Sequence, residues 1–492
     1  MTTHGRRESI GPNDVHPNLI GGAWVEGTGV NENVNPSDTT DVVGRYTLAD
    51  AAQAHEAFAA ARAAAPAWAE SSPLLRFEIL DNAGSEILRR KDELGDLLAR
   101  EEGKTLPEAV GEVVRAAHIF KFHAGQALRP AGQLLDSIRP GVEVAVTREP
   151  VGVVSIITPW NFPIAIPAWK IAPALAYGNT VVFKPAELVP GSAWELVNIL
   201  HGAGLPAGVL NLVMGRGRDI GDILTSSADA VSFTGSVQTG ERVLASAQGS
   251  RARVQLEMGG KNPLVVLDDA DLGIAVECAL QGAYGSTGQR CTASSRFVVT
   301  AGIHDQFVER ITERMLALQV GDARAAGTQM GPVVDPSQLA QDEKYVDIAR
   351  HESGTVIGGR RLERASDGFY LEPALVVGTK PEDTINRDEV FGPVASVVEV
   401  ASYDEALAVA NGTEFGLTSG IVTTSLAAAT DFRRRSTAGM VMVNVPTAGV
   451  DFHVPFGGKG DSSHGPREQG FAAVDFFTSS KTSYTFAGTP RN

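Results

Sequence analysis

The sequence predicts an α/β protein with two domains, each built around a mostly parallel sheet. Its 492 residues exceed the length that a single hydrophobic core usually serves, so two or three domains are expected. From residue 151 onwards, short β-branched runs alternate with segments of helical length. This alternation is typical of βαβ units, in which helices cover a parallel sheet.

The amino-terminal part of the chain has a different pattern. The first twenty or so residues are polar and lack periodicity, so we expect a loosely held arm rather than a targeting signal. Residues 51–101 are rich in Ala, Leu, Glu and Arg, and apolar residues such as Leu75 and Ile79 recur at helical spacing. This segment predicts two or three helices before the first sheet.

Two sets of strand-like runs follow. The first contains VGVVSIIT, NTVVFK, GVLNLV and AVSFT, separated by helical lengths such as residues 166–177 and 193–201. The second has VQLEMG, NPLVVLDD and SSRFVVT early and MVMVN late, and we expect the change of domain near Gly259 and Gly260. The runs VEVAVTREP and KTSYTFAG fit neither set. They are either strands that pair with a neighbouring subunit or surface strands of the same domain.

Composition limits the compartment and the partners. Lys and Arg number 42 against 58 Asp and Glu, a net charge of -16, which repels a phosphate backbone and an anionic membrane surface. We therefore expect neither nucleic acid nor a membrane as partner, and the sequence has no run of about 18 apolar residues that would predict a membrane span. Two cysteines exclude a disulfide framework, which favours the reduced cytoplasm.

Polar and glycine-rich loops follow several predicted strands. They contain PWNFP, KPAE, TGS with Gly240 after it, and EMGG. Any one of them is weak support for a site, because Pro and Gly beside strands usually form turns, and the loop with Gly217 and Gly221 is equally weak alone. Parallel sheets bind cofactors at the carboxyl ends of their strands, so the order of these loops on consecutive strands predicts a cofactor site.

A dinucleotide needs a helix amino terminus for its pyrophosphate and polar groups for its ribose hydroxyls. Gly235 and Ser236 precede a predicted helix over residues 237–247, so their amides can face the pyrophosphate. Lys184 and Glu187 can share the adenosine ribose. The carboxylate would repel a 2′-phosphate and so favours NAD over NADP, whereas the lysine argues mildly the other way. The alternative for this pair is a solvated surface ion pair.

Seven motifs occur in the order and at the spacing of the aldehyde dehydrogenase superfamily, which the chain resembles from about Leu19 to the tail. They are PWNFP, KPAE, FTGS with a following Gly, EMGGKNP, GQRCT, EVFGPV and PFGG. The resemblance implies a Rossmann-type cofactor domain, an α/β catalytic domain and a small oligomerisation β-flap.

On this basis we predict three parts of the chain. Residues 1–127 and 149–259 form the NAD-binding domain, residues 260–454 the catalytic domain, and residues 128–148 and 455–492 the oligomerisation segment. The resemblance also implies a homodimer or homotetramer, which would account for the two strand-like runs outside both sets.

Cys291, in the run GSTGQRCTASS, resembles the family nucleophile. An aldehyde loses hydride only after its carbon becomes tetrahedral, and addition of a thiolate achieves this. The alternative is an inert buried thiol, which describes Cys278 in the apolar run AVECALQGAYG better. Asn161 and the Cys291 amide would stabilise the oxyanion, although Asn161 could instead cap the next helix. Glu257 is the candidate base that activates water.

The resemblance extends to the nicotinamide end of the cofactor. Glu389 and Phe391 resemble the family's nicotinamide-ribose contacts, and would otherwise be a surface acid and a core aromatic. NADP is a possible second cofactor, and no metal site is predicted. The predicted cofactor site comprises Ile157, Thr158, Pro159, Trp160, Lys184, Glu187, Gly217, Gly221, Phe233, Gly235, Ser236, Glu389 and Phe391.

The run GVDFHVPFGG, followed by SSHGPREQG, resembles the branch that oxidises 2-oxoglutarate semialdehyde (2,5-dioxopentanoate), although KGD stands where that branch has a more basic run. A dicarboxylate product requires a cation at the far end of the substrate. Arg290 is the candidate, and its alternative is a surface or interface arginine; Lys170 is a second candidate with a structural alternative. Phe162 and Phe456 complete the predicted substrate site.

Other readings stay open. Succinate semialdehyde and simple aliphatic or aromatic aldehydes are alternative substrates. The simple aldehydes need no cation in the site. An acylating dehydrogenase would pass the thioester to coenzyme A, but that variant lacks the base that Glu257 supplies. A catalytically idle binding or structural protein would have lost Cys291, Glu257 or Asn161, and all three are present.

Overall fold

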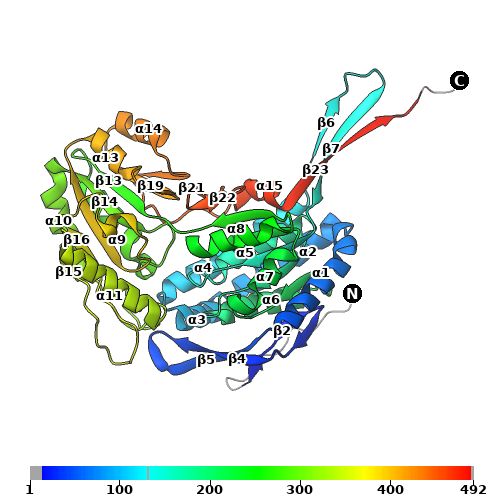
Figure 1. The fold of residues 1–492 in the computed structure, drawn as a ribbon, viewed down its shortest axis with the longest axis horizontal. Coiled ribbons are helices and arrows are strands. Elements are labelled where there is room, and N and C mark those ends of the chain that lie inside the picture. The colour runs from blue at the N-terminus through cyan, green and yellow to red at the C-terminus, as the bar shows by residue number, and fades with distance from the viewer. Residues whose placement is uncertain (1–13, 130–131, 489–492) are drawn as a thin grey trace.

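The computed structural model describes residues 14–129 and 132–488; the predicted amino-terminal arm lies mostly outside them. Two large sheets with their helices form the body of the molecule, and a narrow three-stranded sheet projects from it (Figure 1). Three helices occupy the segment where two or three were predicted: α1 (Ala51–Ala69), α2 (Pro73–Arg89) and α3 (Lys91–Glu102). Asp50 and Ser72 begin α1 and α2 by accepting backbone N–H groups of the first turn.

The first sheet is doubly wound. Its five central strands run parallel in the order β12-β11-β8-β9-β10, so the chain order reverses between β8 and β11. Doubly wound sheets bind their ligands at such a reversal. In spatial order the eight strands are β22 (Ser463–His464), β12 (Arg253–Glu257), β11 (Ala230–Thr234), β8 (Val153–Ile157), β9 (Thr180–Lys184), β10 (Leu210–Leu212), β2 (Asn18–Ile20) and β3 (Ala23–Val25).

Helices cover both faces of this sheet because successive strand side chains point to opposite sides. Val154 and Ile156 pack into one core and Val153 into another. The first core includes α2 and α3 with α4 (Leu106–Ala127), α5 (Ala165–Ala176) and α6 (Pro190–Gly202). The second includes α1, α7 (Gly217–Ser226) and α8 (Val237–Gln248).

The second sheet has seven strands, and only β15 runs antiparallel to its neighbour. They are β15 (Thr355–Gly358), β16 (Ala374–Val377), β17 (Val394–Val400), β14 (Ser294–Thr300), β13 (Asn262–Val266), β19 (Thr418–Val422) and β20 (Met440–Val443). Its helices are α9 (Leu272–Tyr284), α10 (Ala301–Leu316), α11 (Pro336–His351), α12 (Thr384–Arg387), α13 (Tyr403–Ala410) and α14 (Leu426–Arg435).

The chain passes from the first sheet to the second through residues 258–261, where the change of domain was expected. The grouping of VQLEMG with the second set was wrong, because β12 pairs with β11 along its whole length. β11, α8 and β12 follow one another in the chain as a βαβ unit, so this strand continues the first set. The domain boundaries themselves stay a prediction.

The projecting sheet consists of β6 (Gly132–Asp136), β7 (Val142–Pro150) and β23 (Thr478–Phe486), paired antiparallel (Figure 1). It contains both runs that fitted neither set of strands. Segment 455–492 is not confined to it, because β22 joins the first sheet. The remaining short elements are β1 (Val15–His16), β4 (Gly29–Asn35), β5 (Asp38–Leu48), β18 (Phe415–Gly416), β21 (Lys459–Gly460), η1 (Gly285–Gly288), η2 (Gly470–Ala472) and α15 (Ala473–Phe477).

Candidate active site

Cys291 lies on the loop between η1 and β14, in the wall shared by two cavities of about 240 and 370 Å³. Ser286 and Thr287 in η1 have positive φ, 48° and 57°, so the chain is kinked shortly before Cys291. Asn262 fixes the loop by donating its Nδ2–H to the Cys291 carbonyl at 2.7 Å. Cys278 is buried in the apolar core around α9, as expected for an inert buried thiol.

The 370 Å³ cavity lies at the reversal point of the first sheet. The loop after β8 contributes Pro159, Trp160 and Asn161, and the loop after β11 contributes Gly235 and Ser236. Ser236 begins α8 and accepts the Thr239 N–H. The cavity therefore combines a helix amino terminus with backbone that can approach a pyrophosphate, as the sequence analysis expected.

Glu389 and Phe391 form the opposite wall of this cavity. The Glu389 carboxylate accepts the Gly260 N–H at 2.9 Å, and burial raises the pKa of Glu389 to about 7. A Cβ at Gly259 would lie 2.0 Å from this carboxylate, so a larger residue there would displace the Glu389 carboxylate. The Phe391 ring meets Trp160 edge-on, with centroids 5.4 Å apart.

The predicted ribose contacts lie together at the outer end of the same sheet edge. Lys184 Nζ and Glu187 Oε1 are 3.8 Å apart, and the Gly217 N–H donates to the same oxygen at 3.1 Å. Ile157 and Thr158 lie at the end of β8, Phe233 lies in β11 and Gly221 in α7. None of these seven predicted cofactor residues is among those that line the 370 Å³ cavity.

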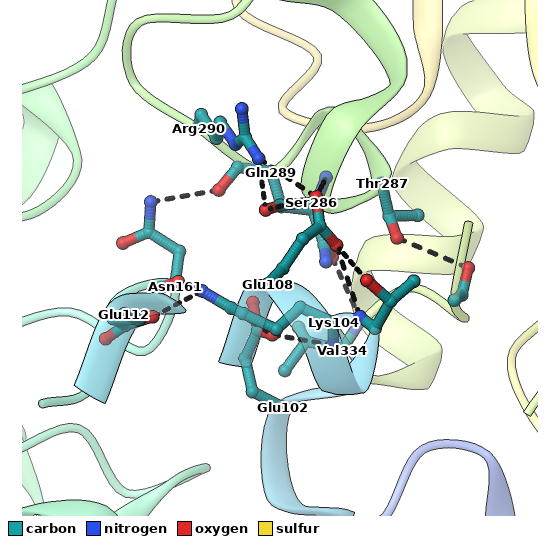
Figure 2. A network of polar contacts seen from close by, with 12 residues as sticks. Glu102, Lys104, Glu108, Glu112, Asn161, Ser286, Thr287, Gln289, Arg290 and Val334 are labelled. Atoms are coloured by element: carbon teal, nitrogen blue, oxygen red, sulfur yellow. Dashed lines mark hydrogen bonds and ion pairs between the residues drawn. The ribbon is translucent and has the colours of Figure 1, made fainter. Parts of the chain in front are cut away.

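A chain of buried polar contacts holds Asn161 (Figure 2). The Asn161 Nδ2–H donates to the Gln289 backbone carbonyl at 2.9 Å. The Asn161 backbone carbonyl accepts from Lys104 Nζ at 2.7 Å. Glu112 binds Lys104 at 2.6 Å and accepts two backbone N–H groups at the start of α5. The capping group of α5 is therefore Glu112, and the Asn161 side chain does not serve as its cap.

Glu257 is the last residue of β12 and is buried. Ser463 Oγ–H donates to one carboxylate oxygen at 2.6 Å, and the other oxygen has no partner among the described residues. Burial, reinforced by the charge of Glu468, raises the pKa of Glu257 well above its usual value. Glu468 is itself ion-paired with Lys170. Lys170 therefore has a buried carboxylate partner in the folded chain.

The 240 Å³ cavity contains the three predicted substrate residues, Arg290, Phe162 and Phe456. Phe456 packs on Trp169, with ring centroids 5.6 Å apart. Arg290 donates to Glu108 at 3.0 Å and to Ser286 Oγ at 2.8 Å, as Figure 2 shows. The arginine predicted to bind the substrate carboxylate thus lies in the right cavity, but it already has a carboxylate partner.

A family model described as "Aldehyde dehydrogenase family" matches residues 24–483. The chain belongs to this family. The predicted resemblance and the class of enzyme are therefore confirmed.

Two curated relatives span nearly the whole chain. The alpha-ketoglutarate semialdehyde dehydrogenase of Haloferax volcanii is 43% identical over 479 residues, covering 96% of this chain and 99% of the relative. The 2,5-dioxopentanoate dehydrogenase of Saccharolobus solfataricus is 38% identical over 467 residues, covering 94% and 97%. Among solved structures, betaine aldehyde dehydrogenase from Staphylococcus aureus in complex with NAD+ superposes with a TM-score of 0.93 at 32% identity, covering 97% of this chain and 96% of that one. This likeness confirms the predicted fold class, and its bound NAD+ agrees with the predicted cofactor.

Sequence analysis missed the helix face that completes the 240 Å³ cavity. Glu108, Gly111, Glu112 and Arg115 of α4 all line it. Their spacing of three and four residues puts them on one face of a helix. Charged side chains at this spacing inside an otherwise apolar helix were the available signal.

Within residues 14–129 and 132–488, no group of three His, Cys, Asp or Glu side chains could hold a metal ion. No helix in these ranges is long and apolar enough to cross a membrane.

Proposed function

We propose that this chain oxidises 2,5-dioxopentanoate to 2-oxoglutarate with NAD as cofactor. The observation that carries the proposal is the position of Cys291 between a cofactor-type cavity and a second cavity lined by aromatic and charged side chains. Two relatives at 38% and 43% identity are named for this semialdehyde under its two names, which supports the choice of substrate.

The larger cavity, together with the Lys184–Glu187 pair outside its lining, fits NAD. Gly235 and Ser236 offer backbone N–H groups at the start of α8 to the pyrophosphate, and Glu187 offers a carboxylate to the adenosine ribose. Glu389 and Phe391 would hold the nicotinamide ribose. When bound, NAD accepts the hydride that leaves the substrate carbon. The carboxylate of Glu187 makes NADP the poorer cofactor.

In the proposed reaction, the Cys291 thiolate adds to the aldehyde carbon and makes it tetrahedral. The Asn161 amide and the Cys291 backbone N–H stabilise the oxyanion that forms. Once the carbon has lost hydride, the acyl group remains on Cys291 as a thioester. Glu257 then takes a proton from the water that hydrolyses it, which releases the acid and returns Cys291 to the thiolate.

The buried carboxyl of Glu257 favours hydrolysis over transfer of the acyl group to coenzyme A. The presence of Cys291, Asn161 and Glu257 together is unexpected for a catalytically idle member. We also propose a cytoplasmic homodimer or homotetramer. Leu134 and Phe486 of the projecting sheet are exposed by 85% and 66%, and Ile138 in the turn between β6 and β7 by 100%. These exposed apolar side chains support a partner subunit on that sheet.

The test compares kcat/KM for 2,5-dioxopentanoate, succinate semialdehyde, hexanal and benzaldehyde, with the product analysed as free acid or acyl-coenzyme A. We expect 2,5-dioxopentanoate to be preferred and the free acid to form. A preference for hexanal or benzaldehyde would refute the proposed substrate and leave the chemistry of Cys291 intact. An acyl-coenzyme A product would refute hydrolysis by Glu257.

A further inference from the structure

The 240 Å³ cavity carries one positive charge that no ion pair among the described residues neutralises. Five charged side chains line it besides Cys291: Lys104, Glu108, Glu112, Arg115 and Arg290. Lys104 pairs with Glu112 at 2.6 Å and Arg290 with Glu108 at 3.0 Å. Among the described residues no carboxylate lies within ion-pairing distance of Arg115, so the cavity has a net positive charge at this one position.

Neutral groups hold Arg115 in place. One terminal nitrogen donates to the Val450 carbonyl and the other to Gln469 Oε1 at 3.1 Å. The guanidinium carbon lies 5.6 Å from the centre of the Trp169 ring. Its Nε is buried and has no acceptor in the described part of the chain. A guanidinium has five N–H groups, so three of them have no acceptor among the described residues while the group is already oriented.

The carboxylates that attract Arg115 are already paired with other groups or exposed to solvent. Glu112 is bound by Lys104 and by two backbone N–H groups, and Asp451 is exposed to solvent. Burial lowers the pKa of Arg115, against the attraction of Glu112, Asp451 and Cys291. A desolvated charge without a counter-ion is costly, and an anionic ligand would remove that cost.

We propose that Arg115 binds the carboxylate at the far end of the substrate while Cys291 attacks the aldehyde carbon. This inference rests on the proposed function, which supplies a substrate with both groups. A forked guanidinium holds a carboxylate through parallel charge-assisted hydrogen bonds. The same charge gives no advantage to a neutral aldehyde and repels a quaternary ammonium aldehyde. Arg115 thereby selects acid aldehydes over both other classes.

The alternative, that Arg290 binds the substrate carboxylate, predicts a different result in the same experiment. A carboxylate bound by Arg290 would have to compete with Glu108, which holds that guanidinium in the folded chain. Arg115 has no such competitor. The selective loss of acid aldehydes is therefore expected on removing Arg115, and the comparison with Arg290→Met decides between the two arginines.

The test measures kcat/KM of wild type and Arg115→Met for 2,5-dioxopentanoate and for pentanal, a neutral aldehyde of the same carbon number. We expect kcat/KM for 2,5-dioxopentanoate to fall about 100-fold and that for pentanal to change less than about 3-fold. Arg115→Lys keeps the charge without the fork and should lose about 10-fold on the acid aldehyde. Lys121→Met is the matched control, because it removes a cation of α4 that binds Asp81 and Ser85 instead.

Turnover of pentanal shows directly whether each variant is folded. An equal loss on both aldehydes, no loss, or a selective loss in Arg290→Met alone would overturn the proposal. Wild type that prefers pentanal to 2,5-dioxopentanoate would instead refute the proposed substrate, and with it the premise of the inference. The two failures are distinguishable because the first appears only in the variants.

Discussion

Replacing Glu257 with glutamine separates the two halves of the proposed reaction. Glutamine has nearly the same shape, and its carbonyl can accept the Ser463 hydroxyl that now donates to Glu257. It cannot take a proton from water. Because the thioester forms before water is needed, the variant should still oxidise one aldehyde per subunit and then stall.

The size of the effect follows from the role of the group. A positioned general base contributes about 10²- to 10⁴-fold, so steady-state turnover should fall by that factor, or about 2.7 to 5.4 kcal/mol in the barrier to hydrolysis. With hydrolysis so slow, nearly every Cys291 carries a thioester after the first turnover. The initial burst should then approach about one NADH per subunit.

The assay is stopped-flow absorbance of NADH, followed by the steady-state rate on the same sample. Cys291→Ala is the control and should give neither burst nor turnover. Loss of the burst together with turnover in Glu257→Gln would refute the division of labour between Cys291 and Glu257. Unchanged turnover would remove Glu257 from catalysis altogether.

Two further predictions concern the cofactor and the pH dependence. Glu187→Ser should raise the ratio of kcat/KM with NADP to that with NAD about 10-fold or more, because the carboxylate beside Lys184 no longer repels a 2′-phosphate; an unchanged ratio would exclude Glu187 from the ribose site. The hydrogen bond from Ser463 favours the ionised form of Glu257 and so lowers the pKa of Glu257. Ser463→Ala removes this bond and should raise that pKa. The rise of steady-state turnover with pH should therefore move to higher pH, since the base works only when ionised, with the plateau rate preserved; a shift to lower pH would contradict this role.

Local pattern predicted much of the fold. The β-branched runs in the first set correspond to β8, β9, β10 and β11, and the helix expected over residues 237–247 corresponds to α8. Long-range pairing was not predictable in this way. The short strand β22 joins β12 and brings Ser463 to Glu257, 206 residues away in sequence. Nothing in a two-residue strand signals which sheet it enters.

The same division holds for the site. Residues that follow predicted strands, such as Asn161 and Gly235, lie where sheet topology puts them, at the carboxyl ends of β8 and β11. The function of a charged side chain depends on its partner instead. Arg290 and Arg115 are both arginines in the substrate cavity, and only the folded chain reveals that Glu108 pairs with the first and no described carboxylate with the second.

In the proposed reaction, Cys291 and Glu257 need their negative charges at different steps. The raised pKa values of the two groups indicate how one site can serve both steps. Burial, with the charges of Glu389 and Glu257, raises the pKa of Cys291 to about 12, so an ionised Glu257 makes the thiolate harder to form. Coupled acids resist being ionised together. Addition to the aldehyde moves the negative charge from sulfur to the aldehyde oxygen, and departure of the hydride then leaves a neutral thioester on Cys291. Glu257 can then ionise at lower cost, at the step that requires it. The raised pKa values of Cys291 and Glu257 thus favour a sequence in which the two groups are not ionised together. The sulfur attacks first, and Glu257 activates water second.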